Sequence, residues 1–163
     1  MSATDRIAAG VPMPRIGAVR AVAPLSVDVE WSAGPRAGRR ETVSLAPDLH
    51  AYRIYRPLRF DPALFASVHL VDEGAAIAWG SDDAIDMPAT SVERLAAEAM
   101  SNEEFAAFLS RNRLSLDAAA AELGISRRLV AYYAKDRPVP RHIALACAHI
   151  ELRRAGGGLG AVA

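Results

Sequence analysis

The sequence predicts an α+β protein: a small, mostly antiparallel sheet in an N-terminal domain, followed by an all-α helix-turn-helix domain. Two observations predict this division. Between residues 16 and 79, several stretches alternate apolar with polar side chains, the period of a strand with one buried face. From residue 101 onward, apolar residues recur every three or four positions, the period of a helix with one buried face.

Five strands are expected in the N-terminal domain, at 16–22, 25–31, 39–45, 68–71 and 75–79. The second strand has the clearest pattern, because Leu25, Val27, Val29 and Trp31 alternate with polar residues. The glycines and proline between residues 32 and 38 indicate a hairpin loop. An arginine- and tyrosine-rich stretch at 48–59 is expected to cross the sheet as a loop or short helix. Its tyrosines should face inward and its arginines outward, covering the sheet edge. The alternative is that Tyr52, Arg53, Tyr55 and Arg56 stack on a ligand or peptide.

Three further helices are expected, two before and one after the segment 116–135. A connecting helix is expected at 89–100, because Thr90 and Glu93 have the spacing of a capping box. Ser101 and Glu104 repeat that spacing and should begin the next helix. After Pro138 and Pro140, a last helix is expected with a core-facing stripe of Ile143, Ala146, Cys147 and Ile150. A second stripe, formed by Leu145, His149 and Leu152, is free for a partner.

The segment 116–135 has the pattern of two helices joined by a tight turn. Gly124 occupies the turn, where a positive φ costs a residue without Cβ nothing. Ser126 is a good N-cap for the second helix. Ala120 and Val130 are expected to be buried against each other where the helices cross. Together these features predict a helix-turn-helix.

This segment resembles the DNA-binding domains of the Cro and phage-repressor type, also called lambda repressor-like. The resemblance implies that the second helix enters the major groove of DNA and that the protein regulates transcription. Four residues on its early exposed face are then expected to read base edges: Ser126, Arg127, Arg128 and Tyr132. Three basic residues at its end and beyond are expected to hold phosphates: Lys135, Arg137 and Arg141.

A second resemblance covers residues 14–90. The order of a hairpin, a loop, the run Phe65-Ala66-Ser67-Val68 and the run Ile77-Ala78-Trp79 followed by acidic residues is similar to a family of small bacterial domains of unknown function. Members of that family occur near toxin–antitoxin-type gene pairs or joined to a Cro-like domain. The resemblance implies an α+β fold and a bacterial source. It brings no known active site. For the partner of this domain, the candidates are a ligand, a cognate toxin or another protein, and a second copy of the chain.

The predicted domain organisation has five parts. They are a mobile N-terminal arm (1–13), a β-rich α+β domain of unknown function (14–88), a connecting helix (89–100), a helix-turn-helix DNA-binding domain (101–154) and a flexible tail (155–163).

The composition of the chain limits the classes of protein to which it can belong. The chain has 163 residues with 19 basic and 19 acidic side chains, so no overall basicity indicates nucleic acid. The charge is distributed unevenly, because residues 1–100 have a net charge of −3 and residues 101–163 a net charge of +3. A single cysteine, Cys147, permits no internal disulfide and fits the cytoplasm. No apolar run approaches the roughly 18 residues of a membrane span.

No catalytic residue, cofactor or metal is predicted, and the chain is not expected to be an enzyme. Asp82, Asp83 and Asp86 are expected to form a solvated loop, since a bound cation needs more oxygens in fixed geometry. Cys147 is expected in the core of the last helix. No glycine-rich phosphate loop or nucleophile motif is present in the sequence.

Two functions from different classes fit these observations. The first is a sequence-specific DNA-binding protein, a bacterial transcriptional regulator or antitoxin-like autorepressor, which binds double-stranded DNA as a homodimer. The second is a protein–protein interaction adaptor whose helix-turn-helix does not bind DNA. The zero net charge favours the second. The five basic residues and one acid between 126 and 141 favour the first.

Overall fold

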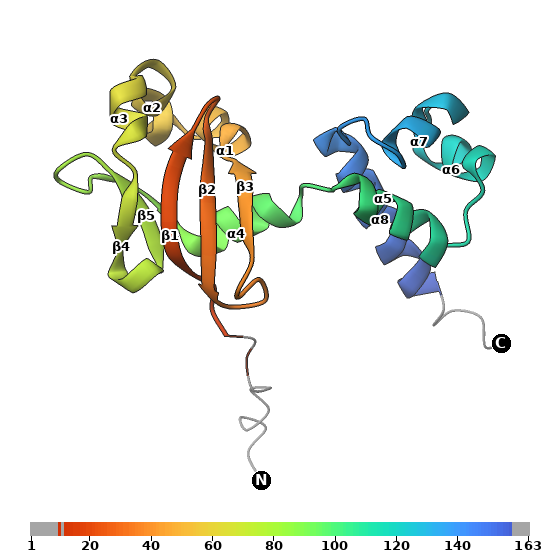
Figure 1. Ribbon diagram of the computed structural model, residues 1–163, viewed down its shortest axis with the longest axis horizontal. Helices are drawn as coiled ribbons and strands as arrows, with labels where there is room; N and C mark the ends of the chain where they lie inside the picture. The colour runs from red at the N-terminus through yellow and green to blue at the C-terminus, as the bar shows by residue number, and fades with distance from the viewer. Residues whose placement is uncertain (1–9, 11, 158–163) are drawn as a thin grey trace, which may run out of the picture. The chain divides into compact units, whose positions relative to one another are not determined.

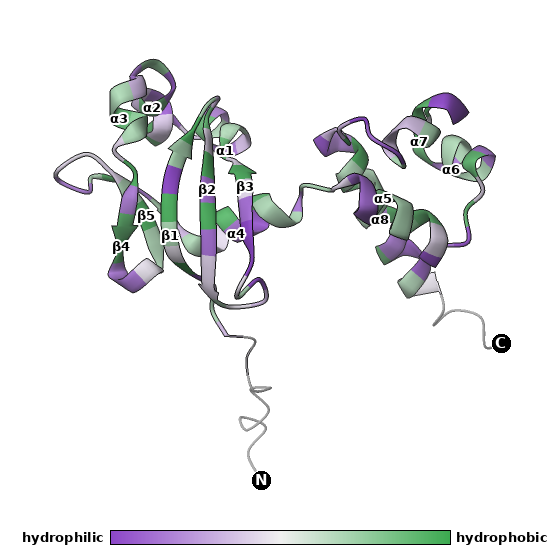
Figure 2. Ribbon diagram, in the orientation of Figure 1, coloured by the Kyte–Doolittle hydropathy of each residue, from purple (hydrophilic) through white to green (hydrophobic). Residues whose placement is uncertain are grey.

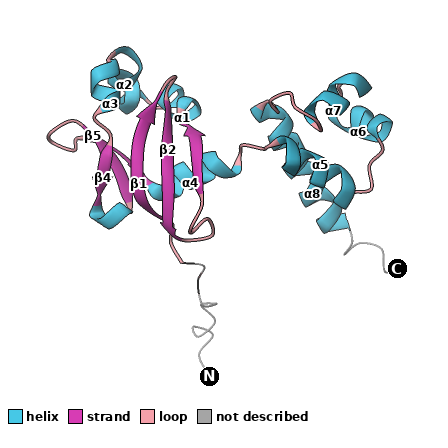
Figure 3. Ribbon diagram, viewed as in Figure 1, coloured by secondary structure: helices cyan, strands magenta, loops and turns pink. Residues whose placement is uncertain are grey.

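The structure is a computed structural model that describes residues 10 and 12–157. The chain forms two compact units that divide between Ala96 and Ala97, the first α+β and the second helical (Figures 1 and 3). The predicted fold class is confirmed. The arm predicted at 1–13 and the tail predicted at 155–163 lie largely outside the described residues, although residues 155–157 still belong to the last helix.

The first unit contains two three-stranded antiparallel sheets where the sequence predicted one sheet. Strands β1 (Arg15–Val22), β2 (Ser26–Ala33) and β3 (Arg40–Ser44) form the first sheet, and β4 (His69–Val71), β5 (Ala76–Trp79) and β6 (Ile85–Pro88) form the second. Strand β6 was not predicted. It has only four residues, including Asp86 and Pro88, so it is too short for an alternating pattern to show.

Both sheets contribute to one hydrophobic core. Trp31 and Trp79 are each 1% exposed, and the ring of Phe65 stacks on Trp79 at a centroid distance of 6.3 Å. Helix α4 (Ala89–Ala97) belongs to this core through Val92 and other small apolar residues. The sequence predicted a connecting helix here with Thr90 as its cap. The helix instead begins before Thr90, and its buried face completes the first unit.

Four short helical segments fill the stretch between the sheets: α1 (Ala46–Ala51), η1 (Arg53–Tyr55), α2 (Arg56–Phe60) and α3 (Pro62–Ala66). The buried carboxylate of Asp48 ties α1 to α4, since Arg94 Nη2 donates to both of its oxygens at 2.7 Å. Tyr55 is buried, and its hydroxyl donates to the Asp86 carbonyl at 3.0 Å. Tyr52 is 57% exposed, so only one of the two tyrosines faces inward as predicted.

The second unit consists of α5 (Asn102–Arg111), α6 (Leu116–Leu123), α7 (Arg127–Tyr133) and α8 (Arg141–Gly157). The capping box of Ser101 and Glu104 is present as predicted. Cys147 is buried in the core of this unit, with Phe105 and Phe108 of α5 in the same core. Figure 2 colours these helices partly green and partly purple, as expected where each has one buried face.

An exposed ion pair, between His69 and Asp83, joins β4 to the loop before β6. His69 Nδ1 lies 2.9 Å from the Ser67 carbonyl, and His69 Nε2 lies 2.6 Å from Asp83 Oδ1. Both ring nitrogens therefore face acceptors, and only the imidazolium ion donates to both. The hydrogen bond to Ser67 and the one to Asp83 raise the pKa of His69 above its ordinary value.

This geometry predicts a pH dependence of the first unit. The stabilisation from His69 should be fully present below about pH 6.5, the ordinary pKa of histidine, and should be lost as the pH rises through the higher pKa of the folded state. NMR titration of the His69 ring should show a lower pKa in Asp83→Asn than in the wild-type protein. The matched control is Asp82→Asn, in the same loop. An equal decrease in both variants would contradict a specific pair.

Candidate nucleic-acid interface

The turn between α6 and α7 is centred on Gly124, as predicted. Gly124 has a left-handed φ of +67°, and its N–H donates to the Ala120 carbonyl. The N–H of Ile125 donates to the same carbonyl at 3.0 Å. This double hydrogen bond ends α6 and turns the chain into α7. The fully buried small residue of α6 is Ala119; Ala120, predicted to be buried, is only half-buried.

Helix α7 has a clear inner and outer face. Ser126 caps it, because its hydroxyl oxygen accepts a hydrogen bond from the Leu129 N–H at 3.2 Å. Val130 is fully buried and Tyr133 is 7% exposed, so both hold α7 in the core of the second unit. Arg127 and Arg128 begin the outer face and are exposed. The arrangement of these side chains follows the helical period read from the sequence.

The outer face of α7 and the loop after it together hold a compact group of two arginines around one tyrosine. Arg128 Nε donates to the Tyr132 hydroxyl at 2.6 Å, and the Arg128 guanidinium lies 5.3 Å from the centre of the Tyr132 ring. The guanidinium of Arg137, five residues further on, lies 4.5 Å from the same ring centre. These cation–π contacts hold two positive charges beside each other on one surface. We call Arg128, Tyr132 and Arg137 the arginine–tyrosine cluster.

The remaining basic residues of the predicted site differ in whether an acidic side chain already pairs with them. Arg127 Nε lies 3.4 Å from Asp117 Oδ1, but both side chains are more than 60% exposed, so this pair is weak. Lys135 is exposed beyond the end of α7. Arg141 lies at the start of α8, where its Nε donates to Glu98 Oε2 at 3.2 Å. The structure thus brings Arg128, Tyr132 and Arg137 together and pairs Arg141 with an acid.

A residue that the sequence did not single out fixes the loop after α7. Asn102, at the start of α5, donates from Nδ2 to the Tyr133 carbonyl at 2.8 Å and to the Arg137 carbonyl at 2.6 Å. One side chain therefore fixes the end of α7 and the backbone of Arg137 to α5. No sequence pattern marks Asn102, because its two acceptors lie more than 30 positions along the chain.

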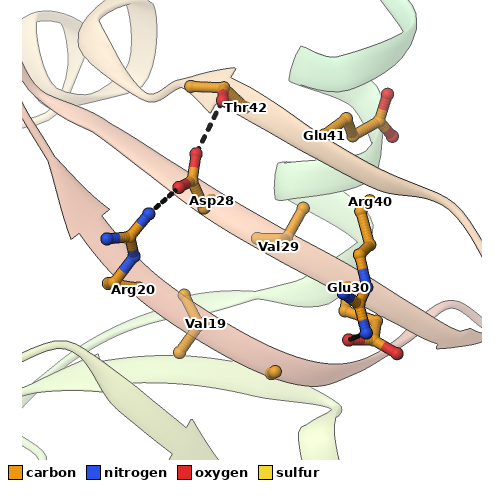
Figure 4. Close-up of a pocket in the computed structure, with 9 residues that line it drawn as sticks. Val19, Arg20, Asp28, Val29, Glu30, Arg40, Glu41 and Thr42 are labelled. Atoms are coloured by element: carbon orange, nitrogen blue, oxygen red, sulfur yellow. Dashed lines mark hydrogen bonds and ion pairs between the residues drawn. The ribbon is translucent and has the colours of Figure 1, made fainter.

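A hollow on the first sheet is a weaker candidate for a site. It measures about 420 Å³ and lies over β1, β2 and β3 (Figure 4). Its polar groups bond one another: Thr42 and Arg20 donate to Asp28, which lowers the pKa of Asp28 below its ordinary value, and Arg40 pairs with Glu30 at 3.0 Å. We interpret this surface as a solvated sheet face.

Within residues 10 and 12–157, no group of three or more His, Cys, Asp or Glu side chains is placed to hold a metal ion. None of the described helices is both long enough and apolar enough to cross a bilayer.

The fold and this site define a two-unit protein with a helix-turn-helix in its second unit. Among solved structures, the chain is similar to the crystal structure of a putative DNA-binding protein from Nitrosomonas europaea. The two sequences are 35% identical over 86% of this chain and 88% of that chain, with a TM-score of 0.42. The identity over this coverage shows that the chain belongs to the same family as the Nitrosomonas protein. No protein-family model and no curated protein matches the chain.

The left-handed turn predicts a graded response to substitution of Gly124. A Cβ built on Gly124 would have no atom within 4 Å, so the cost of a side chain there is conformational rather than steric. Gly124→Val should destabilise the second unit by about 1–2 kcal/mol, because a β-branched residue strongly disfavours positive φ. Gly124→Asn should cost less, because asparagine tolerates this conformation. Thermal unfolding of the two variants would test the order, and equal stabilities would contradict it.

Proposed function

We propose that this protein is a sequence-specific DNA-binding protein that inserts α7 into the major groove, and that it acts as a bacterial transcriptional regulator. The arginine–tyrosine cluster on the outer face of a capped, core-anchored helix carries the proposal. Membership in the family of a Nitrosomonas protein named for DNA binding agrees with it. Autorepression of the antitoxin type, with a toxin bound by the first unit, is the narrower form of this function.

Arg128 is the best-placed residue for base recognition. Its Nε is engaged by the Tyr132 hydroxyl, which fixes the plane of the guanidinium. Its two terminal nitrogens make no hydrogen bond within the described residues, so they are free for a ligand. Guanine presents two acceptors, O6 and N7, in the major groove, and a guanidinium bonds both at once. Arg127 and the Ser126 hydroxyl hydrogen extend the proposed readout along the start of α7.

The proposed phosphate contacts are Lys135 and Arg137, at the end of α7 and in the loop that Asn102 holds. A bound backbone fixes the Arg137 position, which lowers the entropy lost when it contacts DNA. We leave Arg141 out of this set, because its guanidinium already bonds Glu98. When basic residues neutralise DNA phosphates, the counterions bound to those phosphates are released. The affinity of the protein for double-stranded DNA should therefore fall as the salt concentration rises.

A homodimer is part of this proposal. One helix in one groove contacts few base pairs, and proteins of this kind place two helices about 34 Å apart. The α8 stripe is an available surface, since Leu145 is 38% exposed and Leu152 is 73% exposed. The sheets of the first unit are the other candidate surface for the dimer interface.

Selection from a randomised duplex DNA library tests the function directly. The expected result is enrichment of one sequence that contains a guanine at the position read by Arg128. Arg128→Ala should then weaken binding to this site by about 1–3 kcal/mol and remove the preference at that position. Tyr132→Phe, which keeps the ring, should relax the same preference by a smaller amount. If the library yields no enriched site and no basic substitution on α7 affects DNA binding, the adaptor function replaces this proposal.

Removal of a phosphate contact should have a different effect. Arg137→Ala should weaken binding to all sequences alike and lower the slope of log K against log salt by about 1 per protomer. Arg39→Ala is a matched control, because it removes the same charge from an exposed position of the first unit. A salt slope that falls equally in both variants would show a general charge effect.

Light scattering at tens of micromolar tests the assembly, with a dimer as the expected state. Leu152→Glu should yield monomers if α8 forms the interface, because a buried unpaired carboxylate opposes association. Ala107→Glu adds the same charge at an exposed position of α5 and should leave the dimer intact. A monomeric wild-type protein, with and without DNA, would contradict the dimer.

A further inference from the structure

Outside the helix-turn-helix, exposed hydrophobic side chains and arginines are concentrated in the segment Tyr52–Phe60 of the first unit. In the described chain, six large hydrophobic residues are exposed, and three of them lie in this segment: Tyr52 at 57%, Ile54 at 55% and Phe60 at 72%. Three arginines alternate with them, at positions 53, 56 and 59. Exposed aromatic side chains and arginine are the residues enriched at protein–protein interfaces. We call residues 52–60 the arginine–aromatic segment.

The arginines of this segment carry uncompensated charge. The guanidiniums of Arg56 and Arg59 lie 5.9 Å and 5.4 Å from the centre of the Phe60 ring. Among the described residues, neither Arg53 nor Arg56 pairs with an acid through its side chain. Within the same residues, the Arg59 side chain contacts no acid either: its Nη1 lies 3.2 Å from Nδ1 of His50. Arg53 and Arg56 are therefore exposed without an acidic partner in the described chain, and the half-buried Arg59 adds a third positive charge to the segment.

The acids that flank the segment are already engaged. Asp48 is buried and bonds Arg94, and Asp61 caps α3 by accepting from the Leu64 N–H at 3.0 Å. The unit up to residue 96 contains 10 basic and 12 acidic residues, so its positive segment is not a consequence of overall composition. Because the rest of the unit has a net negative charge, an acidic partner is attracted to this segment and repelled elsewhere.

An apolar hollow adjoins the segment. It has a volume of about 430 Å³ and is lined by apolar residues of the β1–β2 turn, α2 and α3, among them Leu25, Leu58 and Phe65, with Arg59 as its charged member. Arg59 Nε is buried there and lacks a hydrogen-bond acceptor among the described residues. Arg59 thus joins the hollow to the Phe60 ring. A hollow of this size accepts one or two apolar side chains beside a carboxylate.

We propose that the arginine–aromatic segment and the adjoining hollow form a docking site for an acidic, apolar peptide segment of a partner protein. Carboxylates of the partner pair with Arg53 and Arg56, and an apolar side chain enters the hollow beside Arg59. DNA is the less suitable occupant. Phosphates attract the arginines equally well, but they leave Ile54 and Phe60 without apolar contact. This docking site does not depend on the DNA-binding proposal.

A random library of 12-residue peptides, displayed on phage and selected on the immobilised full-length chain, tests the proposal. The expected peptides combine at least two Asp or Glu residues with an aromatic or branched apolar residue. Their affinity should fall at least tenfold in Arg56→Glu, and likewise in Phe60→Ala. Both side chains are exposed, so these variants should fold normally.

Two matched controls separate the site from general effects. Arg39→Glu makes the same charge change at another exposed arginine of the first unit, and Met13→Ala truncates another exposed hydrophobic residue of the same unit, at 68%. Both controls should bind the selected peptides with unchanged affinity. The proposal is overturned if no peptide is enriched, if the enriched peptides lack acids, or if they bind Arg56→Glu and Phe60→Ala as well as the wild-type protein. DNA affinity, measured in parallel, should be the same in Phe60→Ala and wild type.

Discussion

The left-handed turn at Gly124 is the constraint on which the second unit depends. Two consecutive N–H groups, of Gly124 and Ile125, converge on the Ala120 carbonyl and fix the angle between α6 and α7. That angle places Val130 in the core, and because α7 is rigid, the opposite side of the helix must face solvent. The position of Arg128 thus follows from a backbone conformation four residues earlier. A different turn would rotate the proposed contact residues away from their common face.

The outer face of α7 shows how a short helix can present a well-ordered surface. Seven residues form few internal hydrogen bonds, so an isolated α7 would be marginal. It is held by a serine cap at its start, by Val130 and Tyr133 along its inner side, and by Asn102 at its end. Tyr132 then orders two arginines that would otherwise sample many rotamers. Less conformational entropy is lost when such side chains bind than when free arginines do.

Local features of this fold could be predicted from the sequence, and features set by distant residues could not. The capping box at Ser101, the turn at Gly124 and the buried Val130 follow from residues three to six positions apart. Strand β6, by contrast, exists because β5 offers it hydrogen bonds. The structural role of Asn102 depends on two carbonyls more than 30 residues away. Ala119 rather than Ala120 is the fully buried residue of α6, about 100° around the helix from the predicted position. Residues 118–121 are all alanine, so the sequence has no pattern that marks which of them faces the core.

The two positive surfaces differ in composition, and this difference is the reason for proposing a different partner for each. At physiological salt, charges further apart than about 8 Å are largely screened, so a chain of zero net charge can still offer strong local attraction. Within the described residues, the stretch from 126 to 141 exposes no large apolar side chain, whereas Tyr52, Ile54 and Phe60 are all more than half exposed. A phosphate backbone supplies charge but little apolar surface. Exposed apolar groups are stabilised only by a partner that removes them from water, which is a property of protein segments. Charge alone therefore does not define either site, and the apolar residues beside the arginines decide which partner each one favours.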